Sequence, residues 1–176
     1  PAGTLGDIGI YSLNRHKNIQ CGEGGIAVAA DDELALRMKL IRNHGENMVE
    51  SPGWTPNSIV NILGFNFRMT EVEASIALEQ LKKLRPLNQH RIDLADHLNK
   101  KLQGIDVLSM PVLRSGCDHV YYMHIMLFDE QRFGISRAKF IEAIRAEGIP
   151  IWGGYMKPLY MAPLYQRKIA IGSGGF

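Results

Sequence analysis

The sequence GDIGIYSLNRHKNI at residues 6–19, followed by GEGG at residues 22–25, carries the strongest structural signal in this chain. Residues 7–13 alternate small or polar residues with larger apolar ones, and residues 25–30 form a short apolar run after glycines. Both patterns predict β-strands. The polar, glycine-rich residues between them predict a loop at strand ends, which is where α/β proteins bind ligands.

The next segments predict helices on either side of a long connection. Asp31 or Asp32 can cap a helix that ends before Gly45, so the order strand, loop, strand, helix indicates an α/β fold. Residues 43–68 are interrupted by prolines and glycines, which is typical of a functional or disordered loop. Thr70 and Glu73 have the spacing of a capping box, which predicts a helix start at this point.

The chain changes character near residue 104. Pro86 is expected to end the helix that starts at Thr70, or to begin the following one, which would run to Gly104. Beyond Gly104 the pattern predicts short strands at 105–110 and 120–128, a helix at 136–147 and a strand at 149–155. This order predicts a small α+β domain after the boundary at residue 104.

Composition excludes several classes of protein. The 176 residues include 20 Lys and Arg and 18 Asp and Glu, a net charge of +2, so nothing in the charge favours a nucleic-acid or anionic-membrane partner. No apolar run approaches the roughly 20 residues that span a bilayer. Cys21 and Cys117 are expected to be reduced thiols, and we predict a cytoplasmic protein. The start at Pro1 and the ending GSGGF suggest a segment of a longer protein.

Lys17 is the candidate for chemistry in the loop between the two predicted strands. A desolvated lysine can lose its proton, and the neutral amine then attacks carbonyl groups to form a Schiff base. The alternative is an ordinary surface lysine in a glycine-rich turn, since lysine side chains are mostly exposed. Residue spacing by itself leaves both interpretations open.

Three segments resemble the signature of the DegT/DnrJ/StrS aminotransferases, which are pyridoxal-phosphate enzymes of fold type I. In residues 6–25, a Gly-Asp pair, a strand ending in Ser12, Lys17 five residues later and then GEGG follow the family pattern. RNHG at residues 42–45 and LGFNFRMTE at residues 63–71 resemble a second family segment, and residues 148–163 resemble a third. The resemblance covers nearly the whole chain.

The resemblance implies specific roles around the cofactor pyridoxal 5′-phosphate. Lys17 would be the catalytic lysine that forms the internal aldimine, and Ser12 would donate its hydroxyl to the cofactor phosphate. Asn66 would reach the phosphate from the partner subunit of a homodimer. Neutral donors on a glycine-rich backbone suit a phosphate. The alternatives are a turn residue for Ser12 and a loop cap for Asn66.

The resemblance also suggests Arg68, His124 and Tyr155 as substrate-binding residues. Arg68 could instead pair with Glu71 or another nearby carboxylate, and His124 on its predicted strand could be a packing residue. Glu23 could position the loop, but a role in the turn is as plausible, so it is not included among the catalytic residues. No metal site is expected, because His119 and His124 lack a ligand spacing and no cysteine pair accompanies them.

The resemblance implies the C-terminal part of a fold type I large domain at residues 1–104, with interdomain helices, followed by a truncated small α+β domain at 105–176. The activity implied is ping-pong transfer of an amino group from glutamate or glutamine to a nucleotide-linked keto-sugar or a cyclitol. The absent first half would hold the acid that pairs with the cofactor ring nitrogen, so we expect the isolated segment to be inactive.

Three alternatives to the transaminase stay open. A histidine in place of the lysine marks a dehydratase branch of the family, but Lys17 keeps the register here. A non-catalytic sensor that binds the cofactor or a sugar is the second alternative. A plain phosphate-binding module is the third, although the GEGG loop lacks the lysine and hydroxyl pattern of a nucleotide P-loop.

Overall fold

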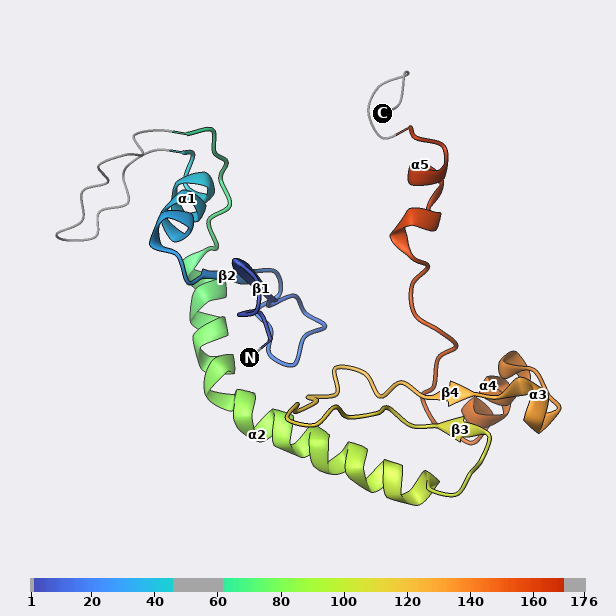
Figure 1. Cartoon of the computed structure of the whole chain (residues 1–176). Helices are drawn as coiled ribbons and strands as arrows, with labels where there is room; N and C mark the ends of the chain where they lie inside the picture. The colour runs from blue at the N-terminus through green and yellow to red at the C-terminus, as the bar shows by residue number, and fades with distance from the viewer. Residues whose placement is uncertain (1, 46–61, 170–176) are drawn as a thin grey trace. The chain divides into compact units, whose positions relative to one another are not determined.

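The computed structural model describes residues 2–45 and 62–169 (Figure 1). The helices and strands are β1 (Ile8–Ser12), β2 (Gly25–Ala29), α1 (Asp32–Arg42), α2 (Glu71–Leu102), β3 (Leu108–Ser109), β4 (Leu127–Phe128), α3 (Glu130–Phe133), α4 (Arg137–Ala146), the 3-10 turn η1 (Leu159–Met161) and α5 (Pro163–Gln166). Most of the predicted connection at 43–68 and the glycine-rich ending lie outside the described residues.

The chain divides into two compact units. The first is Pro1–Lys101 with Leu113–His124, and the second is Leu102–Val112 with Ile125–Phe176. Residues 113–124 therefore belong with the residues that carry β1, β2, α1 and α2. The assignment of enzyme domains at residues 1–104 and 105–176 stays a prediction.

β1 and β2, which lie in the two segments predicted to be strands, pair as an antiparallel hairpin. The register pairs Ile8 with Ala29 and Ser12 with Gly25. The pairing continues into the connecting loop, because Leu13 N–H donates to Gly24 O at 2.9 Å. Ser12 is thus the last residue of its strand, and the loop that follows is fixed at both of its ends.

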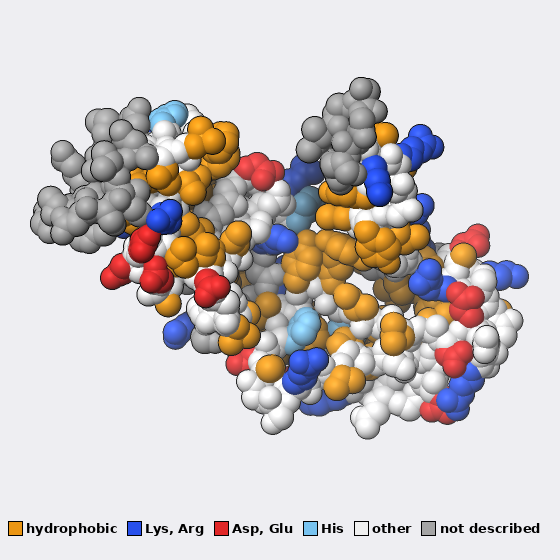
Figure 2. All heavy atoms as spheres, turned by 45° about the horizontal axis from the view of Figure 1, so that its top comes forward, with side chains coloured by type: hydrophobic (Ala, Val, Ile, Leu, Met, Phe, Trp, Pro, Cys, Tyr) orange, Lys and Arg blue, Asp and Glu red, His pale blue; other side chains and the backbone are white. Residues whose placement is uncertain are grey.

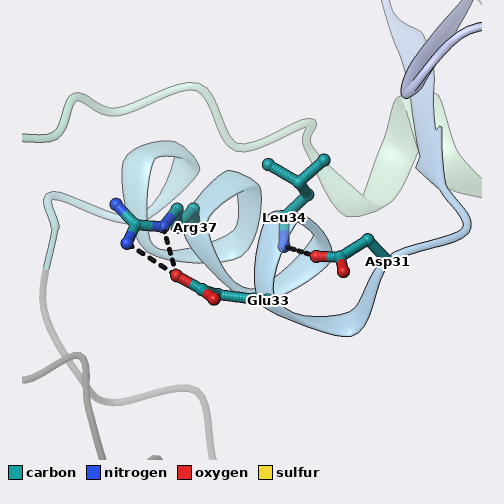
Figure 3. A network of polar contacts seen from close by, with 4 residues as sticks. All are labelled: Asp31, Glu33, Leu34 and Arg37. Carbon is teal, nitrogen blue, oxygen red and sulfur yellow. Dashed lines mark hydrogen bonds and ion pairs between the residues drawn. The ribbon is translucent and has the colours of Figure 1, made fainter.

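α1 begins and packs as its sequence predicts. Asp31 caps the helix, since its Oδ1 accepts the N–H of Leu34 at 2.8 Å, and Arg37 pairs with Glu33 at 2.7 Å one turn on (Figure 3). Leu36 and Leu40 are buried, and Ile62 packs against them. This small apolar cluster is where residues beyond the long connection return to α1.

α2 begins with the predicted capping box. Thr70 N–H donates to Glu73 Oε2 at 3.1 Å, and Glu73 N–H donates to Thr70 Oγ1 at 3.3 Å. The prediction for Pro86 is wrong, because α2 continues through it as one helix of 32 residues. Proline has no backbone N–H, so the Lys82 carbonyl lacks its helical donor. The loss of this bond and the bulk of the ring bend the helix, and the turns on either side stay intact. Figure 1 shows α2 changing direction part-way along its length.

The second unit contains less strand than predicted. Among its described residues only Leu108–Ser109 and Leu127–Phe128 pair, antiparallel, and residues 149–155 form no strand. In that last segment Gly154 has a positive φ, and Ile151 O accepts the Arg145 side chain at 2.7 Å, so its carbonyl is not available to a strand partner. The helix predicted at 136–147 is confirmed as α4, with Ser136 as its cap.

Few side chains are buried among the described residues. The buried ones are Leu13, Cys21, Leu36, Leu40, Ala95 and Tyr121. Many large apolar side chains of both units lie on the surface, and Figure 2 shows them gathered in patches. Patches of this kind mark surfaces that contact other protein or ligands. None of the described helices is both long and apolar enough to cross a membrane.

Candidate functional site

The loop that carries Lys17 is held by backbone bonds from one side to the other. Arg15 N–H donates to Gly22 O at 2.8 Å, Cys21 N–H donates to Leu13 O at 3.0 Å, and Lys17 N–H donates to Asn14 O at 2.9 Å. These bonds close the loop into a compact turn rather than an open excursion. Lys17 therefore projects from a backbone that its own loop fixes.

Side chains add to this frame. Asn14 Nδ2 donates to Glu23 Oε1 at 2.8 Å, so Glu23 braces the loop, which is the positioning role that the sequence left open for it. Gly24 has φ +148°, and a Cβ there would lie 2.7 Å from Met69 Sδ and 3.1 Å from Cys21 Sγ. The GEGG segment thus needs glycine at this position for close packing as well as for its backbone conformation.

Lys17 is half-buried and lies beside an aromatic ring. Its Nζ is 4.6 Å from the centroid of the Tyr122 ring, which is within the range of a cation–π contact. The neighbouring residue Asn18 donates through Nδ2 to Asn88 Oδ1 at 2.8 Å and to Val120 O at 3.3 Å. The loop therefore contacts α2 through Asn18, and it contacts the segment 119–124 through both Asn18 and Lys17.

Ser12 lies where β1 ends and the loop begins. Its Oγ accepts the N–H of Asn14 at 3.2 Å, and the side chain is exposed. A hydroxyl that accepts one bond keeps its own proton for donation. Ser12 can therefore donate to an anion outside the loop.

The segment 119–124 follows one face of α2. Arg91 Nη1 donates to Tyr121 O at 3.4 Å, and His124 Nε2 lies 2.8 Å from Asn99 Oδ1. Asn88, Arg91 and Asn99 are spaced so that they share one face of the helix. We call this row of side chains the α2 ladder. Arg91 and Asn99 bind the segment across about two helical turns, and Asn88 binds Asn18 of the Lys17 loop.

His124 does not lie on a strand, contrary to the prediction, because the α2 ladder holds this segment by side-chain bonds and Tyr121 has a φ of 45°. Its ring stacks on Tyr121 with centroids 5.8 Å apart. Burial lowers the pKa of His124, and His119 acts in the same direction. With Nε2 donating to Asn99, the neutral ring presents Nδ1 as an acceptor, and that buried atom has no partner among the described residues.

Asn66 and Arg68 lie together on the segment before α2. Asn66 pairs with Asn43 through a short antiparallel bridge, and its Oδ1 accepts the N–H of Arg68 at 3.4 Å. Arg68 Nη1 donates to Asn43 Oδ1 at 2.8 Å rather than pairing with Glu71. Both side chains are exposed, and Asn66 keeps its amide N–H groups for a further acceptor.

Tyr155 belongs to the second unit, where its side chain is 70% exposed. The other candidate residues, Ser12, Lys17, Asn66, Arg68 and His124, all belong to the first unit. Within it, direct contacts join the Lys17 loop to the segment that carries His124. Among the described residues no group of His, Cys, Asp and Glu could hold a metal ion.

Sequence reasoning missed Tyr122, Asn18, Asn88 and Arg91. One signal was present, since residues 88, 91, 95 and 99 repeat at helical spacing and include two asparagines and an arginine. The contacts themselves could not be read from the chain, because Asn18 and Asn88 are separated by 70 positions and Asn18 and Val120 by 102.

The sequence profile of the DegT/DnrJ/EryC1/StrS aminotransferase family matches residues 1–174 of this chain. The chain belongs to that family.

Curated relatives from this family are longer than the chain. It is 29% identical to the uncharacterized protein MJ1066 of Methanocaldococcus jannaschii and 25% identical to the spore coat polysaccharide biosynthesis protein SpsC of Bacillus subtilis. In both cases the match covers 99% of the chain and 46% of the relative. The chain spans less than half the length of these relatives.

Solved structures of DegT-family proteins share the fold. Helicobacter pylori PseC, an aminotransferase involved in the biosynthesis of pseudoaminic acid, matches with a TM-score of 0.75 and 28% identity over 97% of the chain and 44% of PseC. Streptomyces venezuelae DesV, solved with a ketimine intermediate, matches with a TM-score of 0.76 and 26% identity over 93% of the chain and 41% of DesV. The chain thus has the fold of a segment of a fold type I pyridoxal-phosphate transferase.

Proposed function

We propose that the complete protein is a pyridoxal-phosphate-dependent aminotransferase that moves an amino group from glutamate or glutamine to the keto group of a nucleotide-linked sugar or a cyclitol. The observation that carries the proposal is the Lys17 loop. It offers an amine, on a fixed backbone, five residues after a hydroxyl that can bind an anion.

The donors of this loop suit the cofactor's chemistry. Ser12 Oγ and Asn66 Oδ1 accept bonds from their own segments, so the hydroxyl proton and the amide N–H groups stay available for phosphate oxygens. A phosphate group accepts several hydrogen bonds, and neutral hydroxyl and amide donors can supply them. We assign Ser12 to the same subunit's phosphate and Asn66 to the partner's, in a homodimer with shared sites.

Lys17 would serve as both anchor and proton carrier. When bound, the cofactor supplies an electron sink that makes the proton on the donor's α-carbon removable. Lys17 Nζ takes that proton as a general base and delivers it as a general acid to the other carbon involved in amino transfer. The loop's hydrogen bonds fix the backbone from which the Lys17 side chain extends.

Arg68, His124 and Tyr155 are proposed to bind the substrates. The Arg68 guanidinium suits a donor carboxylate or a nucleotide phosphate, since it presents several N–H groups in one plane. His124 would contact the acceptor through the accessible part of its half-buried imidazole ring. A sugar acceptor is further supported by the names of SpsC and PseC, which concern polysaccharide and pseudoaminic acid biosynthesis.

The remaining parts of the proposal concern the whole protein. It would act in the cytoplasm as a homodimer, with residues 1–104 in the cofactor-binding domain and 105–176 in the small domain. We expect residues 1–176 by themselves to be inactive, because the family's pairing acid for the ring nitrogen lies elsewhere in the polypeptide.

The test uses the complete polypeptide. It is incubated with pyridoxal phosphate and reduced with borohydride, which fixes the cofactor on the lysine to which it is bonded, and the modified peptide is mapped by mass spectrometry. We expect the label on Lys17 and its loss in Lys17→Arg. A saturated, folded protein without that label would refute the proposal.

Turnover separates an enzyme from a sensor. A separate sample with pyridoxal phosphate, which is not reduced, is supplied with glutamate or glutamine and a panel of nucleotide-linked keto-sugars and keto-cyclitols, and amino products are measured. We expect an amino-sugar or amino-cyclitol product. A protein that carries the label on Lys17 but transfers no amino group to any acceptor would be a binding or regulatory member of the family.

A further inference from the structure

The side chain of Lys17 needs something to hold its amine in place. Lysine ends in a flexible four-carbon chain that carries about 2 kcal/mol of rotamer entropy, so a free amine samples a wide region. Bond formation with a carbonyl needs the amine at one position and in one direction. The loop backbone fixes the Cα of Lys17, but it leaves Nζ unplaced.

The Tyr122 ring supplies a resting place for that amine. Nζ lies 4.6 Å from the ring centroid, where the negative face of the π system attracts an ammonium group. Tyr122 is 38% exposed, so its ring is open enough on one side for a ligand to approach.

The residues that precede Tyr122 in the chain are held in place by hydrogen bonds. Val120 O accepts Asn18 Nδ2 at 3.3 Å, and Tyr121 O accepts Arg91 Nη1 at 3.4 Å. Tyr121 is 5% exposed, and its N–H donates to His119 Nδ1 at 2.8 Å. The backbone that leads into Tyr122 is therefore fixed to α2 and to the residue that follows Lys17.

We propose that Tyr122 is a positioning residue, whose ring face holds the Lys17 amine in one place as the ammonium ion until that amine loses its proton and reacts with the cofactor. The α2 ladder and Asn18 keep ring and amine in register, because the same short segment binds Asn18 and carries the ring. The role belongs to the π face and not to the phenolic hydroxyl. This proposal rests on the proposed function, because holding the Lys17 amine matters only in an enzyme in which Lys17 reacts with the cofactor.

The geometry is tested without cofactor, in the complete protein. Lysine amines are dimethylated with ¹³C-formaldehyde and cyanoborohydride as the reductant, and the dimethyl signal of Lys17 is assigned by its loss in Lys17→Arg. Methyl groups above a ring face are shifted upfield, so we expect an upfield signal in the native protein and in Tyr122→Phe. In Tyr122→Leu the signal should return to the position of exposed lysines, and an unchanged upfield signal would overturn the proposal.

The consequence for reactivity is tested by the rate at which pyridoxal phosphate becomes fixed on Lys17 by borohydride. The ring stabilises the charged ammonium, which must lose its proton before it attacks a carbonyl, so loss of one partly exposed cation–π contact predicts a rate about 2–5-fold higher in Tyr122→Leu. Tyr122→Phe should stay within twofold of the native rate. Tyr122→Met also lacks a π face, and it replaces Tyr122→Leu if that variant does not fold.

The two proposals fail in different ways. A native protein with no label on Lys17 refutes the aminotransferase, whatever the methyl signals show. If the native protein and Tyr122→Leu, or Tyr122→Met, are labelled on Lys17 at the same rate, the proposed function stands and the role of Tyr122 is refuted.

Discussion

The bond between Asn18 and Asn88 predicts how firmly the Lys17 loop is held. Asn18 Nδ2 donates to Asn88 Oδ1 at 2.8 Å, and this joins the residue after Lys17 to α2. In Asn88→Ala, Asn18 keeps only its longer bond to Val120 O at 3.3 Å. We therefore expect the loop to open more often in this variant.

The size of the effect follows from one hydrogen bond. A bond between neutral side chains contributes about 1 kcal/mol net, and this one is part-buried, so the loss is expected near that value. A change of about 1 kcal/mol raises the population of the open loop about fivefold. Amide hydrogen exchange measures that population when the loop opens and closes rapidly.

The assay is hydrogen–deuterium exchange by mass spectrometry on the complete protein, read on the peptides that cover residues 13–24. The amides of Arg15, Lys17 and Cys21 are all hydrogen-bonded within the loop, so they report its opening. We expect about fivefold faster exchange there in Asn88→Ala. Peptides from α1 should be unchanged.

Two variants serve as controls. Asn88→Asp keeps an acceptor oxygen for Asn18 and should exchange at close to the native rate. Asn99→Ala removes a bond of the same type, to His124, about three turns further along α2 and should leave residues 13–24 unchanged. Equal exchange of the loop in Asn88→Ala and the native protein would refute the view that α2 holds the lysine loop.

Three further predictions concern other parts of the structure. Thr70→Ala removes one half of the capping box and should destabilise the start of α2 by about 1 kcal/mol, seen as faster amide exchange in residues 71–75, whereas Thr70→Ser should be close to neutral. Mixed dimers of Lys17→Ala and Asn66→Ala subunits should regain aminotransferase activity, because one site per dimer would then be intact; folded mixed dimers without activity would contradict the placement of Asn66 across the interface. Since partial burial lowers the pKa of His124, the unfolded state binds more protons than the folded state at low pH. The melting temperature should therefore fall as the pH drops below about 6.5, and it should fall less steeply in His124→Phe; equal slopes would contradict a lowered pKa at His124.

Local features of the fold could be predicted from sequence because neighbouring residues determine them. Strands β1 and β2 follow from alternation before the glycine-rich loop and an apolar run after it, and the caps at Asp31, Thr70 and Ser136 satisfy amides within three residues. These bonds form within a single turn of chain. A sequence pattern is sufficient to predict them.

The failures share a tertiary cause. Pro86 would end an isolated helix, but α2 tolerates it, since its remaining turns and its contacts with residues 119–124 outweigh one lost bond. The strand predicted at 120–128 is mostly absent for a related reason. Side chains of the α2 ladder take the carbonyl of Tyr121 and the imidazole of His124, and no neighbouring strand competes for them in the described part of the chain.

The candidate site divides in the same way. Lys17 and Ser12 could be identified because they belong to one short motif. Tyr122 and Asn88 could not, because their part in the site depends on contacts between residues that are far apart in the chain. The residue with the reactive group was visible in the sequence, whereas the residues that hold it became visible only in three dimensions.

The kink in α2 has a mechanical consequence for these contacts. With a rise of about 1.5 Å per residue, Asn88 lies about 3 Å beyond Pro86 along the axis and Asn99 about 20 Å beyond it. If the helix hinges at the proline, a change of about 5° moves Asn99 sideways by about 1.7 Å but Asn88 by only about 0.3 Å. The lysine loop is thus attached next to the pivot, and His124 is attached at the end of the lever arm. Bending α2 would shift the histidine while leaving the amine almost stationary.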